Sequence, residues 1–239
     1  MSQIVNNEAV WAIVPAAGIG ARMQADKPKQ YLELEGKTVI EHTLQRLASH
    51  PRIKGIIVAV AKADPWWPQL SVDSESPIHI VEGGASRADS VLNALLELAI
   101  ISSDDPWVLV HDAARPCLRH QDIDSMLEAL SGHPVGGILG IPVNDTVKRA
   151  NTNKEIIETV DRQSLWRAST PQMFHLQALK QALQSAKQQQ LTITDEASAM
   201  EVAGFQPMMV EGHSDNIKIT VPQDLALASL FIQQQRGAS

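Results

Sequence analysis

Five short runs of almost purely apolar, often β-branched residues recur along the chain and limit the folds open to it. They span 10–14, 56–60, 78–81, 107–110 and 137–141. Strands exposed on one face alternate apolar and polar residues, whereas strands that are apolar throughout are covered on both faces. The runs therefore predict the strands of a mostly parallel sheet that is buried between helices.

Helical patterns fill the intervals between these runs. Thr38 and Glu41 have the spacing of a capping box, and Ser86 and Asp89 repeat it. Further amphipathic stretches lie around 123–130, at 177–190 and at 223–235. Alternating strands and helices imply right-handed βαβ crossovers. We therefore expect one α/β domain that spans 1–239.

The stretch 142–166 departs from this layered pattern. Apolar residues are sparse in it, and the polar turn 151–154 separates two extended segments. This is typical of a β-hairpin. Because an isolated hairpin is marginal in water, it should pack on something. We favour an arm that helps to build a dimer, with a surface insertion as the alternative.

Composition excludes several classes of protein. The 239 residues carry a net charge of −7, with 44% hydrophobic and 20% charged residues, which is ordinary for a folded protein and unfavourable for a general nucleic-acid binder. The single cysteine, Cys117, excludes a disulfide framework. No apolar run approaches the ~18 residues of a membrane span, and no secretion signal is evident. We expect a cytoplasmic protein without a further catalytic domain.

A glycine-rich segment with cations follows the first predicted strand. It reads VPAAGIGARM over 14–23 and is followed by KPKQ over 27–30. Small residues allow close approach of a ligand, and successive N–H groups can face phosphate oxygens. The third glycine of a dinucleotide fingerprint and the Gly-Lys-Ser/Thr of a P-loop are missing. Arg22 and Lys29 favour a polyphosphate site over a tight turn with exposed basic residues.

Two more polar clusters follow later strands. EGGASRADS at 82–90 joins a glycine pair to Arg87 at a helix start, where anions are favoured. The alternative, weighted equally, is that Arg87 is a surface residue paired with Asp89. HDAARP at 111–116 offers Asp112 for a metal or a sugar hydroxyl and Arg115 for a phosphate. In a parallel sheet these loops share one edge, which is where α/β folds bind ligands.

The motifs resemble those of the 2-C-methyl-D-erythritol 4-phosphate cytidylyltransferases. They are PAAGIGARM, KPKQYL, GGASRADSV, VHDAARP, VDRQSLW, TPQMF, ITDEASA and DNIKIT, in order from about residue 10 to 230. The resemblance implies a Rossmann-like, three-layer sheet of the nucleotide-diphospho-sugar transferase type and a homodimer that exchanges β-arms. It also implies CTP and methylerythritol phosphate as substrates and Mg²⁺ as cofactor, in isoprenoid precursor synthesis.

Site residues follow from the same resemblance, position by position. It assigns transition-state stabilisation and phosphate positioning to Arg22, Lys29, Arg162 and Lys218, with Arg162 coming from the partner's arm. It assigns the nucleotide to Ala16, Ala17, Gly18, Gly20, Gly83, Arg87, Ser90, Asp112 and Ala113. It assigns the sugar phosphate to Arg115, Thr146, Thr170 and Thr194, and the metal to Asp112.

The expected chemistry is charge neutralisation and alignment of two anions. A phosphate monoester has a second pKa of about 6, so it is already a nucleophilic dianion near pH 7. No general base is then needed, and we interpret His111 and Cys117 as structural residues. The alternatives are a ribitol phosphate cytidylyltransferase, a pyrophosphorylase using UTP or GTP, an NAD(P)-dependent oxidoreductase and a non-catalytic binding protein.

Overall fold

A seven-stranded mixed sheet forms the centre of the molecule. The computed structural model describes residues 10–18 and 27–237. Across the sheet the strands are β11 (Met208–Glu211), β7 (Gly136–Pro142), β10 (Trp166–His175), β6 (Trp107–Val110), β1 (Val10–Pro15), β4 (Ile53–Val60) and β5 (Ile78–Glu82). Only β10 runs antiparallel to its neighbours. The predicted mostly parallel sheet is confirmed.

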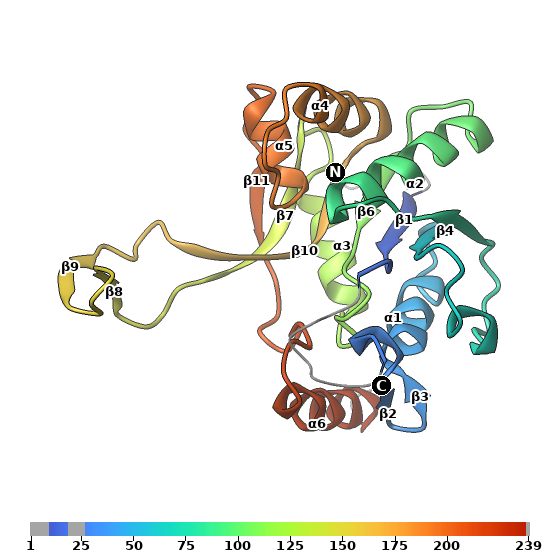
Figure 1. Cartoon of the computed structure of the whole chain (residues 1–239), viewed down its shortest axis with the longest axis horizontal. Helices are drawn as coiled ribbons and strands as arrows, with labels where there is room; N and C mark the ends of the chain where they lie inside the picture. Colours follow the sequence, from blue (N-terminus) through green and yellow to red (C-terminus); the bar gives the residue numbers. More distant parts are fainter. Residues whose placement is uncertain (1–9, 19–26, 238–239) are drawn as a thin grey trace, which may run out of the picture.

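Helices cover both faces of the sheet's central strands, as the apolar runs predicted (Figure 1). The prediction is wrong for the edge strand β5, where Ile80 is 52% exposed. One face is covered by α1 (Val39–Ala48) and α3 (His120–Ala129), and the other by α2 (Arg87–Ile101), α4 (Leu176–Gln188) and α5 (Glu196–Val202). Strand β1 shows the cause, since Ala12 and Val14 belong to the first core while Trp11 and Ile13 belong to the second. The three-layer α/β fold is therefore confirmed.

The last helix, α6 (Gln223–Gly237), packs beside α1 on a third, smaller apolar cluster. Cys117 lies in this cluster and is fully buried. Burial raises the pKa of its thiol to about 12. A buried thiol with a raised pKa is unreactive, so Cys117 is the structural residue that we expected.

Local signals placed the helix starts correctly. At α1 the Thr38 hydroxyl accepts from the Glu41 N–H, and the Glu41 carboxylate accepts from the Thr38 N–H at 2.7 Å, which completes the capping box. At α2 the Ser86 hydroxyl accepts from the Asp89 N–H at 3.0 Å. The Asp89 carboxylate accepts from the Ser86 hydroxyl instead of its N–H, so this second box is only half formed.

Strands β10 and β11 and helix α5 were not predicted. The centre of β10 reads Ser169-Thr170-Pro171-Gln172, and its pairing with β7 shifts register between Ala168 and Gln172. These polar residues are buried because other parts of the chain bond to them, and no local pattern reveals that. Smaller elements are η2 (Lys29–Tyr31), η3 (Trp67–Gln69) and the ribbon of β2 (Glu33–Leu34) with β3 (Lys37–Thr38).

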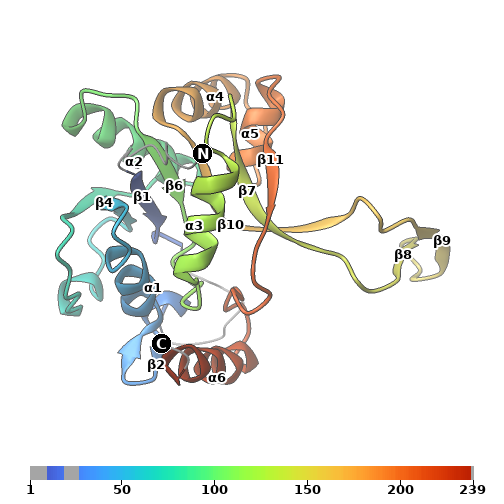
Figure 2. The ribbon, with the colours of Figure 1, turned by 180° about the vertical axis from the view of Figure 1, so that it is seen from behind.

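The predicted hairpin is formed by β8 (Val147–Ala150) and β9 (Ile156–Val160), which pair antiparallel. It stands at the end of a long extension that leaves the body between β7 and β10, as opposite views show (Figures 1 and 2). Ile156 and Ile157 on this arm are 66% and 61% exposed. Within the described residues, none of the helices is both long and apolar enough to cross a membrane.

Candidate active site

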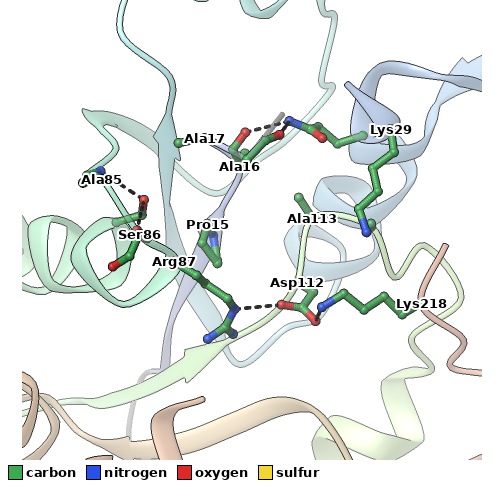
Figure 3. Close-up of a pocket in the computed structure, with 15 residues that line it drawn as sticks. Pro15, Ala16, Ala17, Lys29, Ala85, Ser86, Arg87, Asp112, Ala113 and Lys218 are labelled. Atoms are coloured by element: carbon green, nitrogen blue, oxygen red, sulfur yellow. Dashed lines mark hydrogen bonds and ion pairs between the residues drawn. The ribbon is translucent and has the colours of Figure 1, made fainter. Parts of the chain in front are cut away.

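A cavity of about 290 Å³ opens at the carboxyl ends of the central strands (Figure 3). Its lining includes three segments that the sequence analysis singled out and a fourth from near the chain's end. The lining residues are Pro15, Ala16, Ala17, Gly18, Lys29, Gln30, Gly84, Ala85, Ser86, Arg87, Ser90, Asp112, Ala113, Ala114 and Lys218. The predicted convergence on one sheet edge is thus observed for the described residues.

The loop after β1 is fixed by a buried glutamine. Gln30 donates from Nε2 to the carbonyl oxygens of Ala16 at 2.7 Å and Gly18 at 3.0 Å. The Ala16 N–H donates to the carbonyl of Ala59 at 2.7 Å. These bonds anchor the backbone on which Ala16, Ala17 and Gly18 line the cavity. Gly20 and Arg22, two predicted site residues, lie outside the described residues.

The glycine pair allows the second loop to lie against the first. A Cβ on Gly83 would fall 2.3 Å from the Cβ of Ala17, and one on Gly84 would fall 2.2 Å from the Cβ of Asp89. The Ser90 hydroxyl accepts from the Gly84 N–H and donates to the Ser86 carbonyl, both at 3.0 Å. Ser90 therefore holds the loop together, and Gly84 lines the cavity in place of the predicted Gly83.

Asp112 is the centre of a cluster of cations. Its Oδ1 lies 3.1 Å from Arg87 Nε, and its Oδ2 lies 2.9 Å from Lys218 Nζ and 3.4 Å from Arg115 Nε. Burial alone would raise the pKa of Asp112, but Arg87, Lys218 and Arg115 outweigh it and hold that pKa well below its usual range. The carboxylate is therefore ionised and binds several cations at once.

Lys29 completes the positive side of the cavity. Its Nζ donates to the carbonyl of Ile219 at 2.8 Å, so it lies next to the segment that carries Lys218. In Figure 3 both lysines extend toward the cavity from opposite ends of the chain. Lys29 and Lys218 are thus brought together as predicted.

Arg87 is held by two carboxylates. Its Nη1 and Nη2 donate to Glu196 at 2.7 and 3.0 Å, while its Nε donates to Asp112. Burial would lower the pKa of Arg87, but both carboxylates raise it above its usual range. The alternative pairing with Asp89 is wrong, because Asp89 pairs with Lys187 at 2.7 Å.

A buried histidine, His111, is linked to the backbone of Asp112 through the hydroxyl of Thr170. His111 Nε2 lies 3.0 Å from the Arg115 carbonyl and must donate to it, so its Nδ1 accepts from the Thr170 hydroxyl at 3.1 Å. The Thr170 hydroxyl oxygen also accepts from the Asp112 N–H at 3.1 Å. Burial lowers the pKa of His111 to about 4, so the ring is neutral. His111 is structural, as expected.

Three predicted site residues lie apart from this cavity within one chain. Thr146 and Arg162 are exposed in the extension that carries β8 and β9, and Thr194 is exposed just before α5. Arg162 Nη1 donates to the Asn144 carbonyl within the arm. Arg115 and Thr170 contact the Asp112 cluster without lining the cavity. A single chain therefore leaves the arm residues away from the two small-residue loops that line the cavity.

Two buried polar residues beside the cavity escaped the sequence analysis. Gln30 and Glu196 lie inside the KPKQYL and ITDEASA motifs, yet nothing in the residues themselves assigned them a partner. What identifies them in the structure is burial: Gln30 is 4% exposed and Glu196 is 1% exposed. Buried polar side chains are hydrogen-bonded, so each of them must have a partner. Among the described residues, no group of three or more His, Cys, Asp or Glu side chains is arranged to hold a metal.

Comparisons with known proteins agree on one family. The family model described as IspD, 2-C-methyl-D-erythritol 4-phosphate cytidylyltransferase, matches residues 10–234. The chain is 53% identical to the enzyme of that name from Vibrio vulnificus (strain CMCP6) over 225 residues, covering 94% of this chain and 95% of the relative. It is 54% identical to the one from Pseudomonas putida over 218 residues, covering 91% and 93%.

Solved structures give the same result. The crystal structure of the Francisella tularensis 2-C-methyl-D-erythritol 4-phosphate cytidylyltransferase superimposes with a TM-score of 0.80 at 36% identity, covering 93% of this chain and 99% of that one. Fold, motif order and whole-length identity therefore agree: the chain belongs to the 2-C-methyl-D-erythritol 4-phosphate cytidylyltransferase family.

Proposed function

We propose that the cavity beside Asp112 is the cytidylyl-transfer site of this chain. Enzymes of the family join CTP and 2-C-methyl-D-erythritol 4-phosphate into 4-diphosphocytidyl-2-C-methyl-D-erythritol with release of pyrophosphate, in the non-mevalonate pathway, and this is the activity of the chain. The observation that carries the site assignment is the meeting of Lys29 and Lys218 at one cavity between two small-residue loops.

The two loops supply the nucleotide cradle in this proposal. Ala16, Ala17 and Gly18 and the segment from Gly84 to Ser86 line opposite parts of the cavity. Small side chains there let the triphosphate approach backbone N–H groups, and the start of α2 adds the favourable end of a helix dipole. Because Gly83 packs directly on Ala17, the two loops form one continuous surface for CTP.

The cations stabilise the charge of the chemical step. The sugar phosphate attacks the α-phosphorus of CTP in line with the departing pyrophosphate, and both reactants are anions. Lys29 and Lys218 lie where they can neutralise this charge, and we assign Arg22 the same task by its motif. Such fixed positive groups stabilise the transition state without the cost of reorganising solvent.

A general base is unnecessary for this reaction, and the lining fits that expectation. The described residues of the cavity include neither histidine nor cysteine. The attacking phosphate is mostly a dianion at neutral pH, since its second pKa is about 6. The residues therefore bind and align the substrates instead of moving a proton.

The residues present fit a Mg²⁺ ion held largely by the substrate. Asp112 is the one carboxylate among the described lining residues. Mg²⁺ commonly binds through one or two carboxylates together with substrate phosphates. When bound, the ion would supply charge neutralisation on the triphosphate. Because Arg87, Lys218 and Arg115 surround Asp112, the metal site depends on CTP to supply most of its oxygen ligands.

We infer that the chain acts as a homodimer in which each arm reaches the other subunit's cavity, with 1–239 as one domain. The arm is the segment between β7 and β10, which includes Thr146 and Arg162. It extends away from its own body (Figures 1 and 2). Its exposed Ile156 and Ile157 gain apolar contacts if a second copy covers them. Arg162, with Thr194, would then bind the methylerythritol phosphate beside the nucleotide.

A pyrophosphate-release assay with CTP, Mg²⁺ and a choice of sugar phosphates tests the proposal. We expect turnover with methylerythritol phosphate and little with ribitol phosphate, and CTP to be preferred over UTP and GTP. Equal use of ribitol phosphate would contradict the substrate assignment. Turnover that survives the simultaneous loss of Lys29 and Lys218 would contradict the location of the site.

A further inference from the structure

Glu196 is a deeply buried acidic residue next to the cavity, and the proposed reaction does not use it. It is the first residue of α5 and only 1% exposed. Both of its oxygens accept from Arg87, at 2.7 and 3.0 Å, in a two-point ion pair. This geometry holds a guanidinium in one orientation, because both groups are planar.

The start of α5 is itself fixed to the sheet. Gln172 of β10, which is 1% exposed, donates from Nε2 to the Asp195 carboxylate at 2.9 Å and accepts from the Ala197 N–H at 2.9 Å. The Asp195 carboxylate also caps the helix by accepting from the Ser198 N–H at 2.9 Å. Glu196 therefore projects from a rigid turn, and its position is set before any ligand arrives.

Arg87 lies between this anchor and Asp112. With Nη1 and Nη2 bound to Glu196, the Nε is the group that reaches Asp112, at 3.1 Å. Arg87 also lines the cavity. If Glu196 did not hold its guanidinium, that group could therefore contact the triphosphate of CTP. Free arginine binds phosphate strongly, and it would bind the ground state as well as the transition state.

We propose that Glu196 is a positioning residue, which keeps the guanidinium of Arg87 directed at Asp112 and away from the phosphates of CTP. Glu196 touches no reacting atom in this scheme and acts only through Arg87. The inference rests on the assignment of the cavity to CTP. Its consequence is specific: removing the Glu196 charge strengthens CTP binding while turnover falls.

The test compares Glu196→Gln with Glu201→Gln, an exposed glutamate on the same helix. Titration calorimetry with CTP and Mg²⁺, without sugar phosphate, measures affinity. We expect Glu196→Gln to bind CTP about threefold or more tightly, because a freed guanidinium adds one partly exposed ion pair. We expect its kcat to fall about 10–100-fold, because the carboxylate of Asp112 loses its fixed orientation. Glu201→Gln should match the wild type in both.

Two further variants separate positioning from folding. Glu196→Asp keeps the charge on a shorter side chain, so it should restore wild-type CTP affinity and part of the turnover. In an Arg87→Met background, Glu196→Gln should no longer tighten CTP binding, because the effect needs the guanidinium. If Glu196→Gln does not fold, CTP affinity of Glu196→Asp equal to that of the wild type still supports the proposal, and weakened affinity contradicts it.

The proposal is overturned if folded Glu196→Gln binds CTP with unchanged or lower affinity. A loss of turnover that only tracks the loss of folded protein, measured by circular dichroism, would likewise make Glu196 a purely structural residue. Wild-type protein that does not bind CTP at all would instead overturn the assignment of the cavity, and the wild-type titration shows this before any variant is compared.

Discussion

At the level of single residues, the main feature of the cavity is its cluster of charged side chains. Asp112 carries one negative charge against three neighbouring cations, Arg87, Lys218 and Arg115. Glu196 offsets Arg87, so the group keeps an excess of positive charge, to which Lys29 adds. That excess suits two anionic substrates, and the position of each cation matters more than their number.

Lys29→Ala tests the contribution of one such cation. We expect kcat to fall by about 10²–10³, equivalent to ~3–4 kcal/mol of transition-state stabilisation, since a fixed donor is lost. The melting temperature should change little, and steady-state assays of pyrophosphate release provide the rates. Lys54→Ala, at an exposed position of β4, is the matched control. Near-normal turnover of Lys29→Ala would remove Lys29 from the catalytic set.

Asp112→Asn tests the counter-ion of the cluster. Removing one partner from a buried ion pair typically costs about 3–5 kcal/mol of unfolding free energy, because the remaining charges are left uncompensated. The folded pKa of Asp112 is depressed, so its stabilisation is complete above the unfolded value of about 3.9 and disappears as the pH falls below it.

Urea unfolding of wild type and Asp112→Asn at several pH values checks this. The difference in unfolding free energy should stay constant from about pH 7 to 5 and shrink below about pH 4. A difference that stays the same below about pH 4 would show that the carboxylate titrates near its usual pKa, and the cation cluster would then not stabilise its ionised form.

At the level of elements, the glycine loop before α2 owes its shape to close packing. Gly84 approaches Asp89 in the first turn of the helix, and Gly83 approaches Ala17 in the neighbouring loop. Ser90 then bonds the loop back to the helix. Neither glycine has room for a side chain, so the start of α2 and the loop after β1 are held at one fixed separation.

Gly84→Ala should disturb this arrangement. The new methyl would lie 2.9 Å from the Asp89 carbonyl carbon, a backbone atom, so the loop must move. We expect a loss of about 1–3 kcal/mol in unfolding free energy, together with a raised KM for CTP. Gly237→Ala, where nothing lies within 4 Å, is the control and should leave both unchanged. An unaltered KM in Gly84→Ala would show that the loop does not contact the nucleotide.

At the level of the whole molecule, the arm separates residues that we assign to one site. Arg162 belongs to the segment between β9 and β10, which extends from the body (Figure 1). Lys29, in contrast, lines the cavity. An exchange of arms between two copies would join them. It would also place residues of both subunits at each site, so the two substrates would be held by different chains.

Mixing inactive variants tests this exchange. Lys29→Ala and Arg162→Ala should each be inactive alone, and a refolded equimolar mixture should regain about a quarter of wild-type activity, because half of the dimers are mixed and each has one intact site. Light scattering should report a dimer for both variants. A mixture of dimers that regains no activity would exclude a site shared between subunits.

The apolar strands, the capping boxes and the loops of small and basic residues were readable from the sequence alone. Strand burial is encoded in short runs, and the parallel topology brings Lys29, Arg87 and Asp112 to one edge of the sheet. Even Lys218 was identified, through its motif, although no local pattern shows that it reaches Asp112.

Only the tertiary structure decided which polar groups bond to one another. The strand β10 has no regular apolar pattern in the sequence, because it buries the polar residues Thr170 and Gln172. Their hydrogen-bond partners, the Asp112 N–H and the Asp195 carboxylate, lie far away along the chain. The partner of Arg87 is Glu196, more than a hundred residues away, and not the nearby Asp89. Hydrophobic periodicity is a local property that a sequence displays directly. The pairing of buried charges depends on how distant segments meet, and only the folded chain specifies it.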